Sequence, residues 1–286
     1  MSKATLVIFG LIFAIDFSIG NSLAKVYPHL QIHALNVGQG DAILITTPEQ
    51  NHILIDGGPD GSVLSELPKV MPYMFSKIDL LVLTHPHADH VAGLVDVLDR
   101  YEVGAVLLNP VDYNSKPYNA FLDKIRGLKI YAARADTDFR FGDTYLDVLY
   151  PFESGEWNAN ANNQSVVLMI SRDGHKILLS GDAETDEESL LAGYDLSADI
   201  FKAGHHGSRT SSSMLNKIMP RIMVISSGTD NKYGHPHEET LAGANEFGVE
   251  VLRTDTDGTI SIIFDDYSWI RSIFAPSWRS FSSSFS

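Results

Sequence analysis

The segment HPHADH at residues 85–90 constrains the fold more than any other feature of the 286-residue sequence. It follows four apolar residues and precedes an amphipathic stretch, so we expect a loop between a strand and a helix. On such a loop His85 and His87 can face one centre, while Asp89 and His90 turn toward a second. Imidazole and carboxylate are ligands of zinc, manganese and iron, and two ions about 3.5–4 Å apart form a hydrolytic centre. The spacing predicts a metal site rather than a group of solvated histidines.

Three further groups of the same residue types adjoin expected strands or helices. Asp182 comes directly after an apolar run, and the pair His205 and His206 follows another. His235 and His237 stand immediately before an amphipathic stretch. Any one of these groups could be structural, but the four together predict that several strands end at one metal site.

Short apolar runs alternate with amphipathic stretches, which indicates a mixed α and β chain. The early runs follow one another without helices between them, so we expect mixed sheets with helices outside rather than one parallel sheet. The expected strands cover residues 42–46, 53–55, 79–84, 105–108, 166–170 and 177–180. The expected helices cover residues 63–75, 91–101, 118–126, 184–191, 212–218 and 238–247, and a loop is expected at 153–164.

The composition excludes several classes of site. The chain has no cysteine, which rules out disulfides, thiolate-bound zinc, iron–sulfur clusters and a cysteine nucleophile. Its 21 Lys and Arg against 36 Asp and Glu give a net charge of -15, which repels a polyanion at long range. Any contact with nucleic acid must therefore be arranged locally.

The two ends of the chain differ from its middle. Residues 1–24 have a charged start, an apolar run and small residues at the end, which predicts a signal peptide and export to the periplasm or the extracellular space. The alternative is an uncleaved anchor over residues 5–20, and we expect contact with a membrane only through it. Residues 25–265 form the expected single domain. Residues 266–286 form a C-terminal extension, in which we expect a helix that buries its aromatic side chains, with stacking on bases as the alternative.

The segment HPHADH matches the HxHxDH signature of the metallo-β-lactamase fold, and LIDGG at residues 54–58 resembles the first motif of that fold. More narrowly, the chain is similar to the hydrolase domain of ComEC-type proteins, the DNA-uptake channel proteins of competent bacteria. The similarity extends from about residue 31 to residue 263. It rests on NVGQGDA at residues 36–42, NNQSVV at 162–167, LLSGD at 178–182, KAGHHGS at 202–208, YGHPH at 233–237 and TDTDGTI at 254–260. The resemblance implies a four-layer αββα sandwich with a dinuclear site where the strands end.

The same resemblance implies a role for each matched residue, with two divalent ions, zinc or manganese, as cofactors. The implied metal ligands are His85 and His87 for the first ion, Asp89 and His90 for the second, Asp182 as a bridge and His205 as a further ligand of the second. The implied catalytic residues are Asp89, His206 and His235, although the His205–His206 and His235–His237 pairs could exchange roles. Asp41 and Asp56 are expected to hold the metal ligands in position rather than to bind the ions themselves. Contacts with substrate are expected from Asn163, Lys202, Ser208 and His237.

The chain departs from the family pattern at the first metal site. Many members of the fold carry a histidine just before the strand that leads to the Gly-Asp motif, but here the segment reads NANNQ at residues 160–164. An asparagine or a water molecule would complete the site, which favours manganese because oxygen donors suit that harder ion. ComEC hydrolase domains also often carry aspartate at the position of His87, so this site is richer in imidazole.

These residues predict a metal-dependent phosphodiesterase or nuclease, with DNA as a candidate substrate and a hydroxide shared by two metals as the nucleophile. The first alternative, which the negative charge favours, is an exported hydrolase of small molecules, of the lactonase, β-lactamase, thioesterase or phosphorylcholine esterase type. The second alternative is a non-catalytic metal-binding module. The sequence gives no indication of the oligomeric state.

Overall fold

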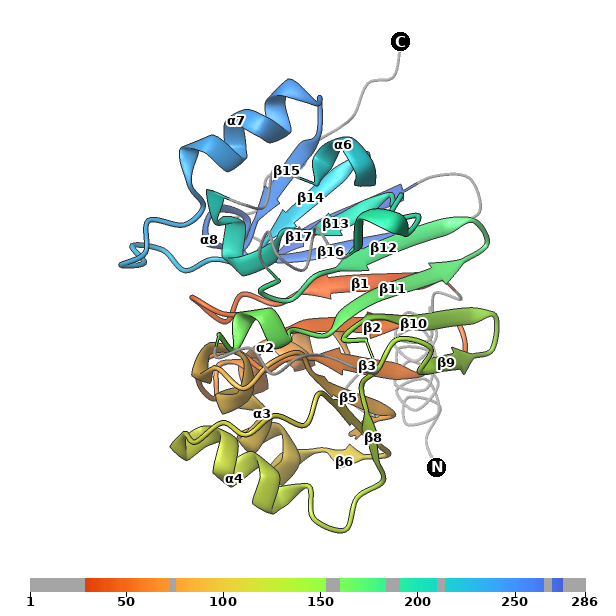
Figure 1. Cartoon of the computed structure of the whole chain (residues 1–286), viewed down its shortest axis with the longest axis vertical. Coiled ribbons are helices and arrows are strands. Elements are labelled where there is room, and N and C mark those ends of the chain that lie inside the picture. The colour runs from red at the N-terminus through yellow and green to blue at the C-terminus, as the bar shows by residue number, and fades with distance from the viewer. Residues whose placement is uncertain are drawn as a thin grey trace, which may run out of the picture.

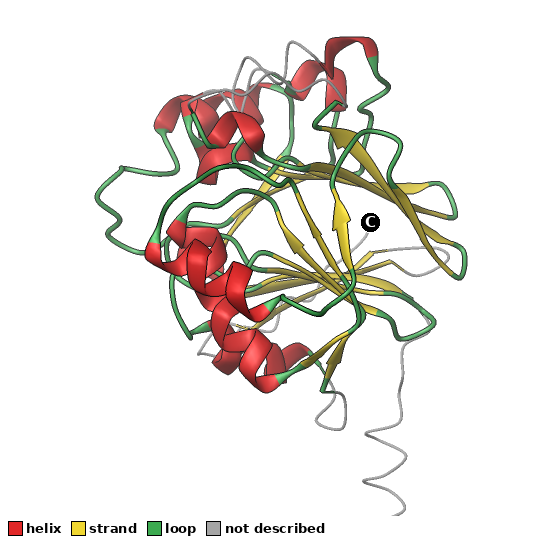
Figure 2. Cartoon of the chain, turned by 60° about the horizontal axis from the view of Figure 1, so that its bottom comes forward, coloured by secondary structure: helices red, strands yellow, loops and turns green. Residues whose placement is uncertain are grey.

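The computed structural model describes residues 29–71, 76–152, 160–183, 191–209, 214–264 and 269–274. Two β-sheets face each other, and helices cover their outer faces (Figure 1, Figure 2). The layers follow the order helix, sheet, sheet, helix, which confirms the αββα sandwich that the resemblance implies.

The first sheet has eight strands in the order β17-β16-β1-β2-β3-β5-β7-β8. Neighbours from β17 to β3 are antiparallel, and neighbours from β3 to β8 are parallel. The change occurs where helices begin to separate the strands, because a parallel pair needs a crossover connection. The strands are β1 (Leu30–Ala34), β2 (Ile43–Thr46), β3 (His52–Ile55), β5 (Leu80–Leu83), β7 (Val106–Leu108), β8 (Ile130–Ala132), β16 (Thr259–Phe264) and β17 (Trp269–Phe274). The crossover helices are α2 (Val63–Val70), α3 (Ala88–Arg100) and α4 (Lys116–Lys124).

The second sheet has seven strands in the order β15-β14-β13-β12-β11-β10-β9, antiparallel from β9 to β12 and parallel from β12 to β15. Its strands are β9 (Asp138–Phe141), β10 (Thr144–Tyr150), β11 (Val167–Arg172), β12 (His175–Leu179), β13 (Ile200–Lys202), β14 (Ile222–Ile225) and β15 (Glu250–Arg253). The other described elements are α6 (Leu215–Ile218), α7 (Glu238–Glu246), α8 (Thr254–Asp257), the short pair β4 (Lys77–Ile78) and β6 (Glu102–Val103), and the 3-10 turns η1 (Asn162–Gln164), η2 (Leu191–Gly193) and η3 (Gly204–Gly207).

The strands β2 and β3 in the first sheet are buried on both faces. On β2, Ile43 and Ile45 join the core between the two sheets, whereas Leu44 packs under the helices of the first sheet. On β3, Leu54 likewise faces the helices while its neighbours face the other sheet. This double burial explains why these strands read in the sequence as continuous apolar runs rather than as an alternation.

The structure agrees with the expected strands to within a few residues, and α3 and α7 lie where helices were expected. Residues 184–190, expected to be helical, and the leader at residues 1–24 lie outside the described residues. The expectation of a helix in the C-terminal extension is wrong for residues 269–274, which pair with β16 as the edge strand β17. Pairing satisfies the backbone groups of β16, which would otherwise form the sheet edge. Across the described residues we find no helix with the length and apolar character that a membrane span needs.

We expect acid to destabilise the fold through His33, a residue of β1. The side chain is 3% exposed, and its Nδ1 lies 2.7 Å from Ser261 Oγ. Burial, helped by the nearby His52, lowers the pKa of His33 to about 3. The unfolded chain, whose histidines titrate near 6.5, therefore takes up this proton first as the pH falls. Below about pH 6.5 the free energy of unfolding should decrease by about 1.4 kcal/mol per pH unit from this group.

The measurement is urea unfolding between pH 7.5 and pH 5 of the native protein and of His33→Asn. Asparagine can keep a polar atom near Ser261 Oγ but does not titrate. The variant should lose stability less steeply as the pH falls, and equal pH slopes for the two proteins would contradict the assignment.

Candidate metal centre

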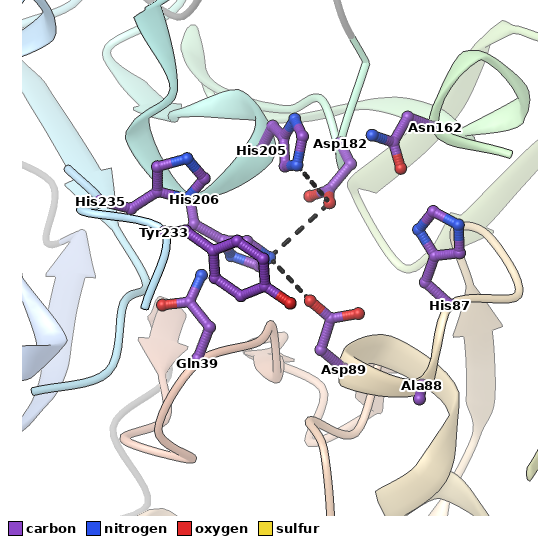
Figure 3. A pocket seen from close by; sticks show the side chains of 10 residues that line it. All are labelled: Gln39, His87, Ala88, Asp89, Asn162, Asp182, His205, His206, Tyr233 and His235. Atoms are coloured by element: carbon purple, nitrogen blue, oxygen red, sulfur yellow. Dashed lines mark ion pairs between the residues drawn. The ribbon is translucent and has the colours of Figure 1, made fainter. Parts of the chain in front are cut away.

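Polar side chains gather at one end of the sandwich, where strands of both sheets end. Asp56 follows β3, and the segment 85–90 follows the parallel strand β5. In the other sheet, Asp182 follows β12, and residues 205–206 follow the parallel strand β13. Parallel neighbours end at the same edge of a sheet, so both pairs of segments meet there. Between them lies a pocket of about 320 Å³ (Figure 3).

Asp182 stands at the centre of the cluster. Its side chain is 2% exposed, and its Oδ2 lies 3.4 Å from His90 Nε2 and 3.6 Å from His206 Nε2. The same oxygen lies 3.7 Å from His85 Nε2 and 3.9 Å from His205 Nε2. One carboxylate therefore faces four imidazole nitrogens, as a bridging ligand would.

A second group overlaps the first at the start of α3. Asp89 and His90 occupy the first turn of this helix, where a carboxylate also complements the helix dipole. Asp89 Oδ2 lies 3.4 Å from His206 Nε2. One ligand atom each from Asp89, His90 and His206 lie within 4.8 Å of one another, as do those of His85, His90 and Asp182. His90 belongs to both groups.

The backbone of η3 turns the two adjacent histidines in different directions. His205 has φ 45° and His206 has φ 54°, so both lie in the left-handed region that is unfavourable for residues other than glycine. Such residues cost about 1–3 kcal/mol each and cluster at functional sites. The result is that His206 is buried, with Nδ1 3.1 Å from the carbonyl oxygen of Ser226, whereas the side chain of His205 stays 31% exposed in the pocket.

Asp56 fixes the orientation of His90 from behind. Its Oδ2 lies 2.8 Å from His90 Nδ1, and its carboxylate accepts hydrogen bonds from the backbone N–H of Thr84 at 2.8 Å and from the Thr84 hydroxyl at 2.7 Å. Burial raises the pKa of Asp56, and His90 and Thr84 act against this rise. Because Asp56 faces Nδ1, His90 can offer Nε2 to a metal ion, which is the arrangement that a metal-ligating histidine needs.

Asp41 and Lys202 form a buried ion pair beside His206. Lys202 Nζ lies 2.9 Å from Asp41 Oδ2, and the two side chains are 1% and 2% exposed. The ammonium also donates to the carbonyl oxygen of Ala203 at 2.7 Å. Asp41 Oδ1 lies 3.4 Å from His206 Nδ1, and the backbone N–H of Asp41 donates to the carbonyl oxygen of Asp89 at 3.2 Å. Asp41 thus links two candidate ligands from the side away from the pocket.

The buried charges shift the pKa values of the cluster in opposite directions. Burial and the neighbouring His90 hold the pKa of His85 well below 6.5. Burial alone would lower the pKa of His206, but Asp182 and Asp41 raise it to about 9, and Asp182 and Asp56 likewise raise that of His90. Despite burial, these histidines hold the pKa of Asp182 well below its usual range. Because metal ligands must be deprotonated, an ion binding here would displace protons from the histidines.

The residues present fit a divalent metal. The Nε2 atoms of His90 and His206 and the Oδ1 of Asp182 are buried and make no hydrogen bond with the described residues. Buried polar atoms seldom stay unsatisfied, and imidazole and carboxylate are the donor types that zinc and manganese take. The cluster therefore has the residue types of a metal site and buried ligand atoms that are free to bind an ion.

The paired histidines differ in how close they lie to the cluster, and so do the residues of the asparagine-rich segment. His206 rather than His205 joins the candidate ligand groups, because the turn of η3 buries His206 against Asp89 and Asp182. In the asparagine-rich segment, Asn162 lines the pocket, whereas Asn163 Oδ1 accepts a hydrogen bond from the Asn160 amide at 3.2 Å. Asn163 does not line the pocket, and its expected contact with substrate stays a prediction.

Three other residues expected to contact substrate, Lys202, Ser208 and His237, are not among those that line the pocket. Lys202 is buried, and its charge is used by Asp41. Ser208 is 9% exposed, and its carbonyl oxygen accepts a hydrogen bond from the Thr240 hydroxyl at 2.5 Å. His237 precedes α7 as its N-cap residue. By contrast His87 and His235 line the pocket as expected.

Sequence reasoning missed Gln39 and Tyr233, which line the pocket together with Asn162 (Figure 3). All three stand in segments that carry the family resemblance, next to residues that were assigned roles. The signal available was the position of Gln39 between two glycines and of Tyr233 directly before Gly234 and two histidines, since loops rich in glycine can approach a site closely.

Close packing of α3 on the segment 56–58 holds the site together, and this gives a testable prediction. A Cβ added at Gly93 would lie 1.9 Å from the carbonyl oxygen of Gly57 and 2.6 Å from that of Asp60. We expect Gly93→Ala to lower the free energy of unfolding by about 2–3 kcal/mol, because backbone must move. At Gly193 a Cβ meets nothing within 4 Å, so Gly193→Ala is the control. Denaturant unfolding of both variants checks the prediction, which equal stabilities would contradict.

Comparison with known proteins decides the family. Residues 35–228 match the family model described as the metallo-beta-lactamase superfamily. The chain belongs to this superfamily. Its candidate ligands lie in the same segments that carry the HxHxDH signature and the other resemblances noted in the sequence.

Curated relatives of this metallo-β-lactamase chain are competence proteins. The chain is 29% identical over 282 residues to ComE operon protein 3 of Bacillus subtilis (strain 168), which covers 89% of this chain and 36% of that protein. It is 30% identical over 231 residues to Competence protein ComA of Neisseria gonorrhoeae, covering 79% of this chain and 31% of the relative. The chain thus spans about a third of the length of these relatives.

Solved structures support the fold. The metallo-beta-lactamase fold protein YhfI from Bacillus subtilis superposes with a TM-score of 0.57 at 14% identity, covering 79% of this chain and 97% of YhfI. A long form of RNase Z from yeast gives a TM-score of 0.53 at 14% identity, covering 84% of this chain and 42% of that one.

Proposed function

We propose that this metallo-β-lactamase chain is a metal-dependent phosphodiesterase that cleaves nucleic acid at a dinuclear site. The observation that carries the proposal is the position of Asp182, whose Oδ2 lies within 3.9 Å of four histidine nitrogens contributed by two segments, 85–90 and 205–206. Structural carboxylates are usually satisfied by one or two partners, whereas a carboxylate that faces this many imidazoles fits a bridge between two ions.

The chain's own residues would divide the binding of the ions among them. His85, His90 and Asp182 form one candidate group and Asp89, His90 and His206 another, while two more groups include Asp41. His90 Nδ1 contacts Asp56, so its Nε2 would bind only one ion. We assign His85 and Asp182 to the first ion and Asp89, His90 and His206 to the second, which would share Asp182. We assign His87 and Asn162 to complete the first site, because both line the pocket on the same side of Asp182 (Figure 3). When bound, divalent ions at such a site activate water and neutralise charge that develops on a phosphate.

Two further histidines face the space where the substrate would bind. The rings of His205 and His235 lie 5.4 Å apart in an edge-to-face arrangement, and both line the pocket. We assign them to hydrogen bonds with the phosphate oxygens and with the leaving oxygen. Asp56 and Asp41 take no part in substrate contacts and act by holding His90 and His206 in place.

The choice of a phosphodiester over a small-molecule ester rests on the similarity to competence proteins. Those relatives are about three times longer, so only the hydrolase-like part is shared. The net charge of -15 favours the small-molecule alternative, and a non-catalytic metal-binding module is the other alternative. The polar pocket, rich in histidine, supports hydrolysis over simple metal storage.

The test uses the purified full chain, stripped of metal and resupplied with manganese or zinc. Substrates are bis(p-nitrophenyl) phosphate, single-stranded DNA and double-stranded DNA, with a lactone, a thioester and a β-lactam beside them. Metal-dependent cleavage of the diester and of DNA supports the proposal. Two bound ions per chain with intact DNA and cleavage of a small ester would favour the small-molecule alternative, and bound ions without any turnover would favour the binding module.

We also propose that the protein is exported through its N-terminal 24 residues. The leader-like composition supports this. N-terminal sequencing of the protein from cells and from the periplasmic or extracellular fraction distinguishes cleavage near Ala24 from a retained anchor.

A further inference from the structure

Tyr233 stands at the mouth of the pocket and has no role in the proposed chemistry. It lines the pocket, yet 54% of its surface is exposed to solvent. Figure 3 shows its ring between His235 and Asp89, with the hydroxyl directed toward Asp89. A large aromatic side chain that is half exposed in a ligand pocket offers a flat apolar face to whatever binds there.

The loop that carries Tyr233 is organised around Asn231. The Asn231 Oδ1 accepts hydrogen bonds from the backbone N–H groups of Tyr233 at 3.2 Å and His235 at 3.0 Å. Its Nδ2 donates to the carbonyl oxygens of Gly228 at 2.9 Å and His235 at 2.6 Å. The ring of Tyr233 is stacked with that of His235, with centroids 5.8 Å apart and planes at 25°. The ring is therefore held in place before any ligand binds.

A series of side chains leads from the metal ligands to this ring. Asp182 Oδ2 lies 3.9 Å from His205 Nε2, the His205 and His235 rings lie 5.4 Å apart, and Tyr233 follows at 5.8 Å. Exposure rises along the series, from 2% at Asp182 to 54% at Tyr233. A nucleotide has the same order of parts, a charged phosphate at one end and a flat base at the other.

Charge gives a reason for a stacking contact at this site. The net charge of -15 repels a polyanion at long range, so affinity must come from short-range contacts. Stacking of a base on an aromatic ring is such a contact, and it tolerates any base sequence. The Lys232 ammonium lies over the Tyr233 ring, 5.0 Å from its centroid, and adds a positive charge at this ring.

We propose that Tyr233 is the base-stacking residue of this site, which makes a nucleotide phosphodiester the substrate class. The binding of the nucleotide's phosphate rests on the proposed function, and the binding of its base rests on Tyr233. Stacking on one ring corresponds to a roughly 5- to 150-fold gain in affinity for a ligand that carries a base.

The experiment measures binding without turnover on the full chain in the presence of zinc. Titration calorimetry gives the Kd of thymidine 5′-monophosphate and of 2-deoxyribose 5-phosphate, which has the same phosphate and sugar but no base. We expect the native protein to bind the nucleotide at least about fivefold more tightly. Tyr233→Ala should bring the ratio of the two Kd values close to one, and Tyr233→Phe should keep it.

The matched control is Tyr145→Ala. Tyr145 is 42% exposed and has the Arg140 guanidinium 5.3 Å from its ring, but it lies on β10 and outside the pocket lining. This variant should keep the native ratio. The inference would be overturned if the native protein bound both ligands equally tightly, or if it bound both weakly or not at all. It would also be overturned if Tyr233→Phe lost the preference for the nucleotide as completely as Tyr233→Ala, because the effect would then belong to the hydroxyl.

Hydrolysis of bis(p-nitrophenyl) phosphate separates this inference from the proposed function. Preference for the base without diester hydrolysis would contradict the proposed phosphodiesterase and leave the stacking role supported. Diester hydrolysis without preference for the base would contradict the stacking role alone.

Discussion

Asp182→Asn is expected to remove metal-dependent turnover almost completely. The asparagine has nearly the same shape but no charge, so the one side chain that faces four histidine nitrogens can no longer bridge two cations. Losing several kcal/mol of charge stabilisation corresponds to roughly a 10³-fold decrease in kcat/KM for bis(p-nitrophenyl) phosphate. We also expect fewer than two ions per chain by elemental analysis after dialysis, because both sites of the proposed dinuclear centre would share this carboxylate.

The matched control is Asp143→Asn, which removes an exposed carboxylate that pairs with Arg140 at 3.1 Å on the surface. It should keep the native metal content and kcat/KM. If Asp182→Asn retained two ions and native turnover, Asp182 would be no bridging ligand, and the proposed dinuclear site would have to be abandoned.

The end of the sandwich that carries the site was predictable from the sequence. Apolar runs indicated a strand before each of four positions: Asp56, residues 85–90, Asp182 and residues 205–206. The histidines and aspartates that follow these runs indicated that the strand ends share one location. β3 with β5, and β12 with β13, are parallel neighbours, so their ends do meet. Strand patterns are local, which is why this part of the prediction needed no knowledge of long-range contacts.

The roles of His205 and His206 were not predictable in the same way. Adjacent residues in a regular strand point to opposite faces, but here both have positive φ values, of 45° and 54°. The turn is imposed by what surrounds it, including the carbonyl oxygen of Ser226, which lies on another strand end. Nothing in the sequence HHGS itself indicates which of the two imidazoles becomes buried against Asp89 and Asp182.

The C-terminal strand was unpredictable for a related reason. Residues 269–274 mix aromatic, aliphatic and charged side chains, and their extended conformation follows from pairing with β16 along its whole length. Tertiary pairing of this kind overrides local propensity, because strand preferences depend on the neighbouring strand.

Burial gives the charge of Lys202 a different role from the one expected from the sequence. Its place next to the motif histidines suggested a contact with phosphate, whereas β13 is buried along its whole length, so the ammonium needs a buried partner. Asp41, distant in the sequence, supplies that partner at 2.9 Å. We therefore expect Lys202→Met to lower the free energy of unfolding by about 3–5 kcal/mol, because it leaves a buried carboxylate without its cation.

Adding Asp41→Asn to Lys202→Met should restore part of this stability, since the remaining group is then neutral, and urea unfolding of the single and double variants gives the coupling energy. The control is Lys176→Met, which breaks an exposed pair with Asp195 at 2.9 Å and should cost less than about 1 kcal/mol. Because Asp41 also lies 3.4 Å from His206 Nδ1, Lys202→Met should weaken metal binding by roughly 10- to 100-fold. Native stability together with native metal affinity in Lys202→Met would mean that the pair neither stabilises the fold nor orients His206.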